Sequence, residues 1–264
     1  MKNKEKLKGT TEKIEAIDTK TTVKEKGLST FPFVSIITPT YNRKRFIPYL
    51  IECYKNQIYP KEYMEWIIYD DGSESVEELF KNLPFPNVRY IYEIEKQNIG
   101  VKRNRLNKEA KGEIIIAMDD DDYYPPERVH HVVGAFRSRP KYELAGSSEV
   151  YMYYTDIHEI YKLGPYSSNH ATNGTMAWRK SYAMNHTYDE NVTHAEEKSY
   201  LESYKHPMIQ LDPFKTMLVM SHSENTFDKK KMREQENNPF VKKSQLKIKD
   251  FIKNKILREF YSNA

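Results

Sequence analysis

The chain alternates short apolar runs with longer segments in which apolar residues recur every three or four positions. A short run bounded by polar or turn residues is typical of a buried strand, and the longer spacing is typical of a helix that packs one face on a core. In the first half these patterns predict strands at 33–38, 66–69, 88–93 and 114–118, and helices at 46–57, 76–82 and 100–110. Pro39 is expected to stop the first strand. The alternation predicts an α/β fold with a Rossmann-like, mostly parallel central sheet and flanking helices.

The pattern changes in the second half, where strands become more frequent than helices. It predicts helices at 126–137 and 196–204, a strand pair at 149–154 and 157–162, and further strands at 174–179, 209–211 and 217–221. We therefore expect a second, smaller sheet in this part of the chain.

The end of the chain, 229–264, is expected to form a basic amphipathic helix over about 244–261. Opposite its Lys-rich side runs an apolar stripe made of Ile248, Phe251, Ile252, Ile256 and Phe260. Three uses of this stripe stay open: packing on the body of the protein, contact with a partner such as a second copy in a homodimer, and binding to a membrane surface.

Charge is distributed unevenly along the 264 residues, although the net charge is only +4. Residues 1–30, rich in Lys, Glu and Thr, carry +3 and are predicted to be a flexible extension. Residues 229–264 carry +7, which leaves −6 for the domain at 31–228. An acidic body argues against a groove for nucleic acid and is compatible with a pocket that binds a cation.

Cysteine content and hydropathy bear on the compartment. Cys53 is the only cysteine, so no internal disulfide can form, which favours a reducing compartment. The first residues lack the apolar core of a signal peptide, and no run approaches the roughly 20 apolar residues of a membrane span. We therefore expect a cytoplasmic protein.

Two predicted strands end in paired carboxylates. The run 114–118 leads directly into four consecutive aspartates, Asp119 to Asp122, and 66–69 leads into Asp70-Asp71. Side chains alternate along a strand, so Asp119 and Asp121 should point to the same side. Ligands of open α/β sheets bind beyond the carboxyl ends of the strands, and paired carboxylates suit Mg²⁺ or Mn²⁺. The alternative is a solvated acidic turn.

Four motifs follow one another in a specific order. They are Val-Ser-Ile-Ile-Thr-Pro-Thr-Tyr-Asn-Arg at 34–43, Tyr-Asp-Asp-Gly-Ser at 69–73, Asn-Ile-Gly-Val-Lys-Arg-Asn at 98–104, and Met118 to Asp122 leading into Tyr-Tyr-Pro-Pro. In this order and spacing the chain resembles family 2 glycosyltransferases with the GT-A fold, strongly over 33–137 and more weakly to about 228.

The resemblance implies a metal-dependent enzyme that moves a sugar, with inversion, from a nucleotide-sugar to an acceptor hydroxyl. The donor would be a UDP-sugar, the cation Mn²⁺ or Mg²⁺, and the acceptor a glycan, a protein or a lipid-linked saccharide. It also implies that 31–137 forms the nucleotide-sugar-binding half and 138–228 the acceptor-binding half, with the smaller sheet on the acceptor side.

The resemblance assigns donor and metal roles to individual residues. The uracil base would be bordered by Thr38, Pro39, Tyr41 and Arg43 and hydrogen-bonded by Asp70 or Asp71. Arg103 would reach the donor, Asp119 would contact the ribose and the metal, and Asp120 would lie at the donor without a defined contact. Asp121 and His222 would bind the metal. The alternatives are packing for Tyr41, a turn or helix-cap role for Asp70, a solvated helix face for Arg103 and a structural role for His222.

The resemblance also implies an acceptor site and a catalytic base. Glu196-Glu197 matches the acidic pair that begins a helix in the family, although Glu-Asp is commoner there. Glu197 is the expected base, and Glu196 would orient an acceptor hydroxyl or cap the helix; which of the two acts stays open. Gly174, Thr175 and Trp178 would line the acceptor side, where Trp178 either stacks on a sugar or belongs to the core.

Two other functions compete with glycosyl transfer. A sugar-phosphate nucleotidyltransferase would share the sheet and the acidic metal site, but it normally has a Gly-rich loop after the first strand, which residues 38–41 lack. A non-catalytic nucleotide-sugar-binding protein of the same fold would not need the acidic pair.

Overall fold

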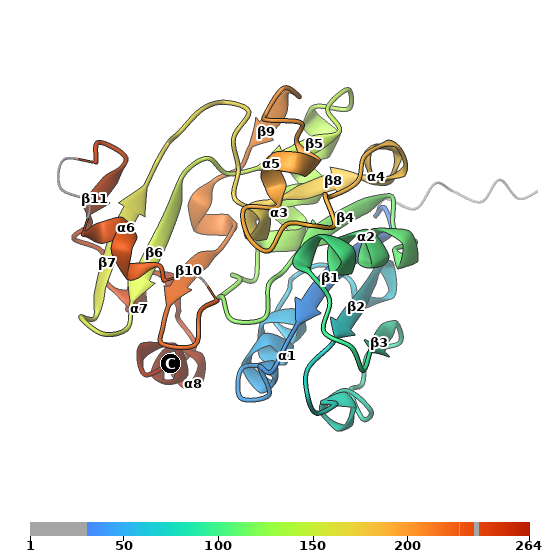
Figure 1. Cartoon of the computed structure of the whole chain (residues 1–264), viewed down its shortest axis with the longest axis horizontal. Coiled ribbons are helices and arrows are strands. Elements are labelled where there is room, and N and C mark those ends of the chain that lie inside the picture. Colours follow the sequence, from blue (N-terminus) through green and yellow to red (C-terminus); the bar gives the residue numbers. More distant parts are fainter. Residues whose placement is uncertain (1–30, 227, 235–237) are drawn as a thin grey trace, which may run out of the picture. The chain divides into compact units, whose positions relative to one another are not determined.

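A computed structural model describes residues 31–226, 228–234 and 238–264 (Figure 1). They contain a seven-stranded sheet, a four-stranded sheet and the helices that flank them. The predicted α/β class, with a large, mostly parallel sheet and a smaller second one, is confirmed. The flexible extension predicted at 1–30 lies outside the described residues.

The large sheet has the strand order β3-β2-β1-β4-β8-β5-β9. Its strands are β1 (Val34–Thr40), β2 (Met64–Asp70), β3 (Val88–Tyr92), β4 (Ile114–Ala117), β5 (Leu144–Gly146), β8 (Ala177–Arg179) and β9 (Met208–Gln210). Only β8 runs antiparallel to its neighbours, β4 and β5. β1, β2 and β4 are buried at every position, which explains why their sequences are nearly continuous apolar runs.

Alternate residues of these strands enter two separate cores. Ile36 of β1 and Ile116 of β4 belong to the larger core, while Ile37 and Ile115 belong to the smaller one on the other face. The helices that cover the sheet are α1 (Ile47–Lys55), α2 (Ile99–Glu109), α3 (Arg128–Ser138), α4 (Lys180–Asn185) and α5 (Glu197–Tyr200). α1 and α3 supply apolar side chains to the larger core, and α2 packs on β1 and β2 from the other side.

The small sheet has the order β10-β6-β7-β11. It consists of the predicted hairpin β6 (Val150–Tyr154) and β7 (Glu159–Leu163), together with β10 (Leu218–Ser221) and β11 (Val241–Lys243). An isolated bridge joins it to the end of the large sheet, because Tyr123 and Leu218 exchange backbone hydrogen bonds of 3.1 and 2.9 Å. This bridge brings the end of β10 next to the aspartates that follow β4.

The single tail helix predicted at 244–261 is wrong. The tail forms α6 (Lys230–Arg233), β11, α7 (Ile248–Phe251) and α8 (Lys255–Ser262), and the chain leaves the helical conformation at Ile252. Phe251 and Ile252 are buried and Phe260 stacks on Tyr49 of α1, so the tail packs on the body. Ile256 is 68% exposed because the break moves it off the apolar stripe. Among the described helices, none has the length and apolar character needed to cross a membrane.

Three other predicted elements are shorter than expected. The helix predicted at 76–82 is only a 3₁₀ turn at Glu77–Leu79. The segment that precedes Pro84 and Pro86 is too short for an α-helix to propagate. The strand at 174–179 begins only at Ala177, after a 3₁₀ turn. The helix at 196–204 is reduced to α5, because residues 202–204 all have positive φ angles that terminate it.

The expectation that Pro39 stops the first strand is also wrong. β1 continues through Thr40 and pairs with β2 over its whole length. Its pairing with β4 ends earlier, at Ile37, so a residue without an N–H group at position 39 removes no hydrogen bond from that ladder.

Two glycines provide a matched test of this packing. A Cβ at Gly112 would lie 2.4 Å from the backbone nitrogen of Ser35 in β1, whereas nothing lies within 4 Å of one at Gly134, inside α3. We expect Gly112→Ala to lower the free energy of unfolding by about 1–3 kcal/mol through overpacking. Gly134→Ala should raise it by roughly 0.5–1 kcal/mol, since Ala favours the helix. Urea denaturation measures both, and equal effects would contradict the close approach at Gly112.

Candidate active site

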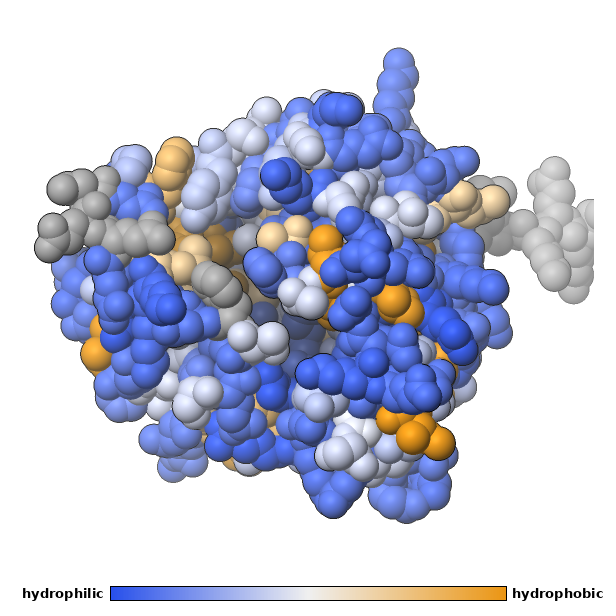
Figure 2. Space-filling view, viewed as in Figure 1, coloured by the Kyte–Doolittle hydropathy of each residue, from blue (hydrophilic) through white to orange (hydrophobic). Residues whose placement is uncertain are grey.

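A cavity of about 610 Å³ opens at the carboxyl ends of β1 and β4. The face of the protein that carries it is mostly hydrophilic and is hollowed near its centre (Figure 2). The residues expected in the site that line this cavity are Pro39, Tyr41, Arg43, Arg103, Asp119, Asp120, Asp121 and Glu196. The residues expected there that do not line it are Thr38, Asp70, Asp71, Gly174, Thr175, Trp178, Glu197 and His222.

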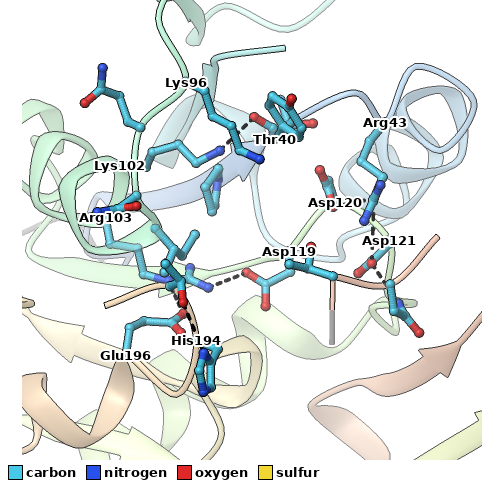
Figure 3. Close-up of a pocket in the computed structure, with 18 of the residues that line it drawn as sticks. Thr40, Arg43, Lys96, Lys102, Arg103, Asp119, Asp120, Asp121, His194 and Glu196 are labelled. Atoms are coloured by element: carbon cyan, nitrogen blue, oxygen red, sulfur yellow. Dashed lines mark hydrogen bonds and ion pairs between the residues drawn. The ribbon is translucent and has the colours of Figure 1, made fainter. Parts of the chain in front are cut away.

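Arg103 of α2 connects the two acidic sides of the cavity (Figure 3). Its Nε donates to Glu196 at 2.7 Å and its Nη2 to Asp119 at 2.9 Å. The side chain is only 3% exposed, so the solvated-face alternative is wrong. Burial alone would lower the pKa of Arg103, but Asp119 and Glu196 raise it above its ordinary value. The Asn173 amide can satisfy both Arg103 and Tyr188 when it is flipped. Its oxygen then accepts from Arg103 at 2.8 Å, and its nitrogen donates to the Tyr188 hydroxyl.

The aspartates after β4 have different environments. Asp121 contacts Nε2 of His222 at 3.2 Å and accepts from the Asn225 amide at 3.2 Å. Burial would raise the pKa of Asp121, but Lys229, His222 and Arg43 together hold it below its usual value. Burial and the neighbouring Asp121 raise the pKa of Asp120 to about 7. The acidic run is therefore mostly enclosed, and the solvated-turn alternative is wrong.

Asp122 is a structural member of the same run. Its carboxylate accepts from the backbone N–H of Met220 in β10 at 2.7 Å, and its carbonyl accepts from the Tyr261 hydroxyl at 3.0 Å. Burial raises the pKa of Asp122 to about 8. This residue ties the end of β4 to the small sheet and to α8.

The metal ligands expected from the sequence converge only in part. Asp121 and His222 are in contact, whereas Asp119 is paired with Arg103. Among the described residues, no set of three that includes these aspartates has its ligand atoms within 4.8 Å of one another. Mg²⁺ and Mn²⁺ are commonly held by one or two protein groups together with water and substrate phosphates. Nδ1 of His222 accepts from the N–H of Glu224 at 3.2 Å, so Nε2 carries the proton that faces Asp121. The Asp121–His222 pair would hold such a cation, without a third protein ligand, once that proton is released.

The carboxylates at the end of β2 do not line the cavity. Asp70 and Asp71 are each 1% exposed. Asp70 accepts from the Gly72 N–H and from the Tyr90 hydroxyl, which is the turn role left open by the sequence. Asp71 accepts from Lys102 at 2.6 Å and from the N–H of Gln97 at 2.7 Å. Neither carboxylate is free to bind a base in this structure.

Thr38 has a structural role as well. Its hydroxyl donates to the carbonyl of Met118 at 2.7 Å and accepts from the indole N–H of Trp66 at 2.9 Å. It is fully buried beneath the cavity, so a direct contact with the base is not available to it.

The residues expected on the acceptor side are also buried. Trp178 has no exposed surface, donates its indole N–H to Asn107 at 3.0 Å and packs edge-on against Tyr200. Trp178 therefore belongs to the core, and in this structure its ring has no surface on which a sugar could stack. Thr175 is buried too, and its hydroxyl donates to the Thr172 carbonyl. A Cβ at Gly174 would lie 2.8 Å from Asp119 Oδ2, so glycine allows the backbone to approach that carboxylate.

The two glutamates of the acidic pair differ in their surroundings. Glu196 lines the cavity and is held by Arg103. Glu197, the next residue, does not line the cavity and has no ion-pair partner among the described side chains. Burial and the adjacent Glu196 raise the pKa of Glu197 to about 7.

Several polar residues of the cavity were not expected from the sequence, and four of them are Lys96, Lys102, Asn225 and Lys229. Lys96 lies over the Tyr41 ring, with its Nζ 4.2 Å from the ring centroid, and Lys102 also donates to the Thr40 carbonyl. Lys102 stands beside Arg103 in the basic helix and could have been found there. Lys229 and Asn225 follow β10, and only the bridge between the sheets brings them to the site.

Sequence comparison gives partial matches to glycosyltransferases. An uncharacterized glycosyltransferase of Haemophilus influenzae is 33% identical over 107 residues, 40% of this chain and 35% of that protein. The poly(ribitol-phosphate) beta-N-acetylglucosaminyltransferase TarS of Staphylococcus aureus is 32% identical over 97 residues, 35% of this chain and 17% of TarS. The matches thus span about a third of these relatives or less.

Structural comparison and a family profile extend the similarity. The mannosyltransferase PcManGT of Pyrobaculum calidifontis superimposes with a TM-score of 0.60 at 15% identity, over 75% of this chain and 59% of that one. S. aureus TarS superimposes with a TM-score of 0.54 at 18% identity, over 73% of this chain and 59% of that one. The profile of glycosyl transferase family 2 matches residues 35–195, more than half of the chain and most of the cavity wall. The chain therefore belongs to glycosyl transferase family 2, and its fold is GT-A.

Proposed function

We propose that this protein transfers a sugar from a UDP-sugar to an acceptor hydroxyl, with inversion and with the help of a divalent cation. The observation that carries the proposal is the arrangement of charged groups around the cavity. Arg103 lies between the Asp121–His222 pair, which would bind the cation, and the Glu196-Glu197 pair, which would bind the acceptor. Solved relatives support the choice of ligands: the TarS structure is a complex with UDP-GlcNAc, and that of the mannosyltransferase contains GDP-Man and Mn²⁺.

Positive groups on three sides of the cavity would receive the diphosphate of the donor. Arg43 follows β1, Lys96 precedes α2, and Lys229 follows β10. Arg103 adds a fixed positive charge on the fourth side, where Asp119 holds it in place. When bound at Asp121 and His222, a divalent cation would supply further stabilisation for the charge that develops on the leaving diphosphate. Charges already positioned for the transition state need no rearrangement during the reaction.

Glu197 is the group best suited to accept the proton of the acceptor. The acceptor oxygen forms its bond to the anomeric carbon while the bond from that carbon to the diphosphate oxygen breaks, and the hydroxyl proton passes to Glu197. A pKa near 7 allows this carboxylate to be unprotonated at neutral pH and still basic enough to act. Glu196 is held by Arg103 and would orient the acceptor instead. Because Glu197 begins α5 and does not line the cavity, the acceptor hydroxyl would reach it on the α5 side.

Family membership argues against the nucleotidyltransferase alternative. A non-catalytic sugar-binding protein would bind the donor without turning it over, so a transfer and hydrolysis assay separates it from an enzyme. The glycan, protein or lipid-linked acceptor, the cytoplasmic location, the homodimer and a peripheral membrane contact through the basic tail stay predictions.

The acidic pair offers a test of the base. Glu197→Gln should lower kcat by about 10²–10⁴, the usual contribution of general-base catalysis. Donor affinity should be nearly unchanged, because the cation-binding edge is intact. Glu196→Gln is the matched control and should lose less. Turnover of the best UDP-sugar found in a screen measures both variants. If Glu196→Gln is the inactive one, the assignment within the pair is reversed; retained anomeric configuration in the product would contradict the displacement itself.

The raised pKa of Glu197 predicts the pH profile of the reaction. Only the unprotonated carboxylate can accept a proton, so kcat/KM should fall about tenfold per pH unit below pH 7 and level off above it. Steady-state rates between pH 5.5 and 8.5 check this expectation. A rate independent of pH over that range, with chemistry rate-limiting, would show that no group with this pKa acts as the base.

Asp121 is the residue to change in a test of the cation site. Asp121→Asn should abolish the Mn²⁺-dependent part of UDP binding, measured by calorimetry with and without the metal, because it removes the charge that faces His222. Asp156→Asn, at the turn of the β6–β7 hairpin, removes a carboxylate away from the cavity and should bind UDP as the wild type does. Unchanged metal-dependent affinity in Asp121→Asn would exclude Asp121 from the site.

A further inference from the structure

A second group of metal-ligand side chains lies outside the cavity. His186 directly follows α4, and Glu202 and His206 lie in the segment between α5 and β9. Their ligand atoms are all within 4.8 Å of one another, and in the part of the chain that the structure describes no other three His, Cys, Asp or Glu side chains meet this condition. We propose that these three residues bind a divalent transition-metal ion, for which Zn²⁺ is the best match. None of them lines the candidate active site.

The hydrogen bonds of the two histidines leave one nitrogen of each available. Nδ1 of His186 is 3.0 Å from the backbone carbonyl of Tyr182. A carbonyl only accepts, so Nδ1 carries the proton and Nε2 keeps its lone pair, as in most protein-bound imidazole ligands. Nε2 of His206 is buried and has no hydrogen-bond partner in the described part of the structure. Both Nε2 atoms lie within 4 Å of the Glu202 carboxylate.

The spacing of the ligand atoms suits zinc. Nε2 of His186 is 3.8 Å from Oε1 of Glu202, and Nε2 of His206 is 3.4 Å from its Oε2. Ligands about 2.0–2.1 Å from a tetrahedral Zn²⁺ lie roughly 3.3–3.4 Å apart. The two nitrogen–oxygen distances end on different oxygens of Glu202, and the three ligand atoms lie within 4.8 Å of one another, so the side chains would move closer together around the ion. Two imidazoles and one carboxylate are a donor set that Zn²⁺ takes, with water in the fourth position. The same set suits Mg²⁺ poorly, since that ion prefers oxygen ligands.

Rigid packing on one side keeps the site in place. The His186 ring stacks on the Tyr182 ring, with centroids 3.8 Å apart, and the Tyr182 hydroxyl donates to the carbonyl of Tyr200 in α5. On the other side, Glu202, Ser203 and Tyr204 have φ angles of 45°, 60° and 62°, which are strained for residues other than glycine. An ion bound between His186 and Glu202 would hold this strained segment against α4.

The bound ion would also act on the acidic pair. α5 begins with Glu197, and the segment that follows it carries Glu202 and His206. Metal binding at the far end of α5 therefore restrains the element that positions the proposed base. The alternative is an ion pair between Glu202 and protonated histidines, which needs no metal and forms only when the imidazoles are charged.

Binding of Co²⁺ and Zn²⁺ to the full chain, without a polyhistidine tag and after dialysis against a chelator, distinguishes these cases. We expect one equivalent of Co²⁺ to give visible d–d absorption that Zn²⁺ displaces, and Zn²⁺ to raise the unfolding temperature. His206→Ala and Glu202→Gln should each weaken binding by more than about 100-fold, because loss of a group that only orients a ligand already costs 10–100-fold. Neither variant should then respond to Zn²⁺ in thermal unfolding.

Two control variants separate this site from other histidines and from the cavity. His130→Ala removes an exposed histidine of α3, and Asp121→Asn removes the carboxylate of the proposed nucleotide-linked cation site. Both should bind Co²⁺ as the wild type does when no nucleotide is present. The proposal is overturned if the wild type binds no Co²⁺ or Zn²⁺, or if binding survives in both His206→Ala and Glu202→Gln. Loss of binding in Asp121→Asn alone would place the ion in the cavity and overturn it equally.

Discussion

The site depends on one buried cation, the guanidinium of Arg103. A buried charge is tolerated only when it is paired and hydrogen-bonded, and here Asp119 and Glu196 supply the partners from the end of β4 and the start of α5. The pairing fixes three elements, α2, β4 and α5, around one point. It keeps Asp119 away from the Asp121–His222 pair, and it holds Glu196 so that the neighbouring Glu197 is left without an ion-pair partner among the described residues. Removing this arginine would leave the buried Glu196 and the partly buried Asp119 without their cationic partner.

A second constraint joins the two sheets. The Tyr123–Leu218 bridge and the hydrogen bond from Met220 to Asp122 seat β10 against the acidic run. Only this contact brings His222, at the end of β10, to Asp121, which is 101 positions earlier in the chain. The tail adds support from behind, because the Tyr261 hydroxyl of α8 donates to the Asp122 carbonyl. The C-terminal segment is therefore part of the framework of the site, whatever else its basic surface binds.

The four consecutive aspartates show how strongly position decides chemistry. Asp121 meets His222, Lys229 and Arg43, which hold its pKa low, so it remains a charged carboxylate. Asp120 and Asp122 are buried beside that charge, and their pKa values rise. Each of the four aspartates follows the end of β4 and faces different neighbours, so four identical residues have at least two different protonation behaviours.

The sequence by itself determined the sheet and the place of the site. β1, β2 and β4 are buried at every position, and most of their residues are apolar. The carboxyl ends of parallel strands meet at one edge of the sheet whatever the details of packing. That local signal was sufficient to locate Asp119 and Asp121 at the cavity. The helix at 100–110 could also be read, because its basic residues are close together in the chain.

Only the tertiary structure decided which polar groups are free. Asp70 and Asp71 look like ligands in the sequence, yet Tyr90 and Lys102 from other elements already satisfy them. Trp178 became core because α5 and its neighbours cover it, and the tail helix broke where Ile252 had to enter the body. The meeting of His186 with Glu202 and His206 also has no local signal. Each of these outcomes depends on contacts between residues far apart in the chain, and no pattern of spacing within one segment records such contacts.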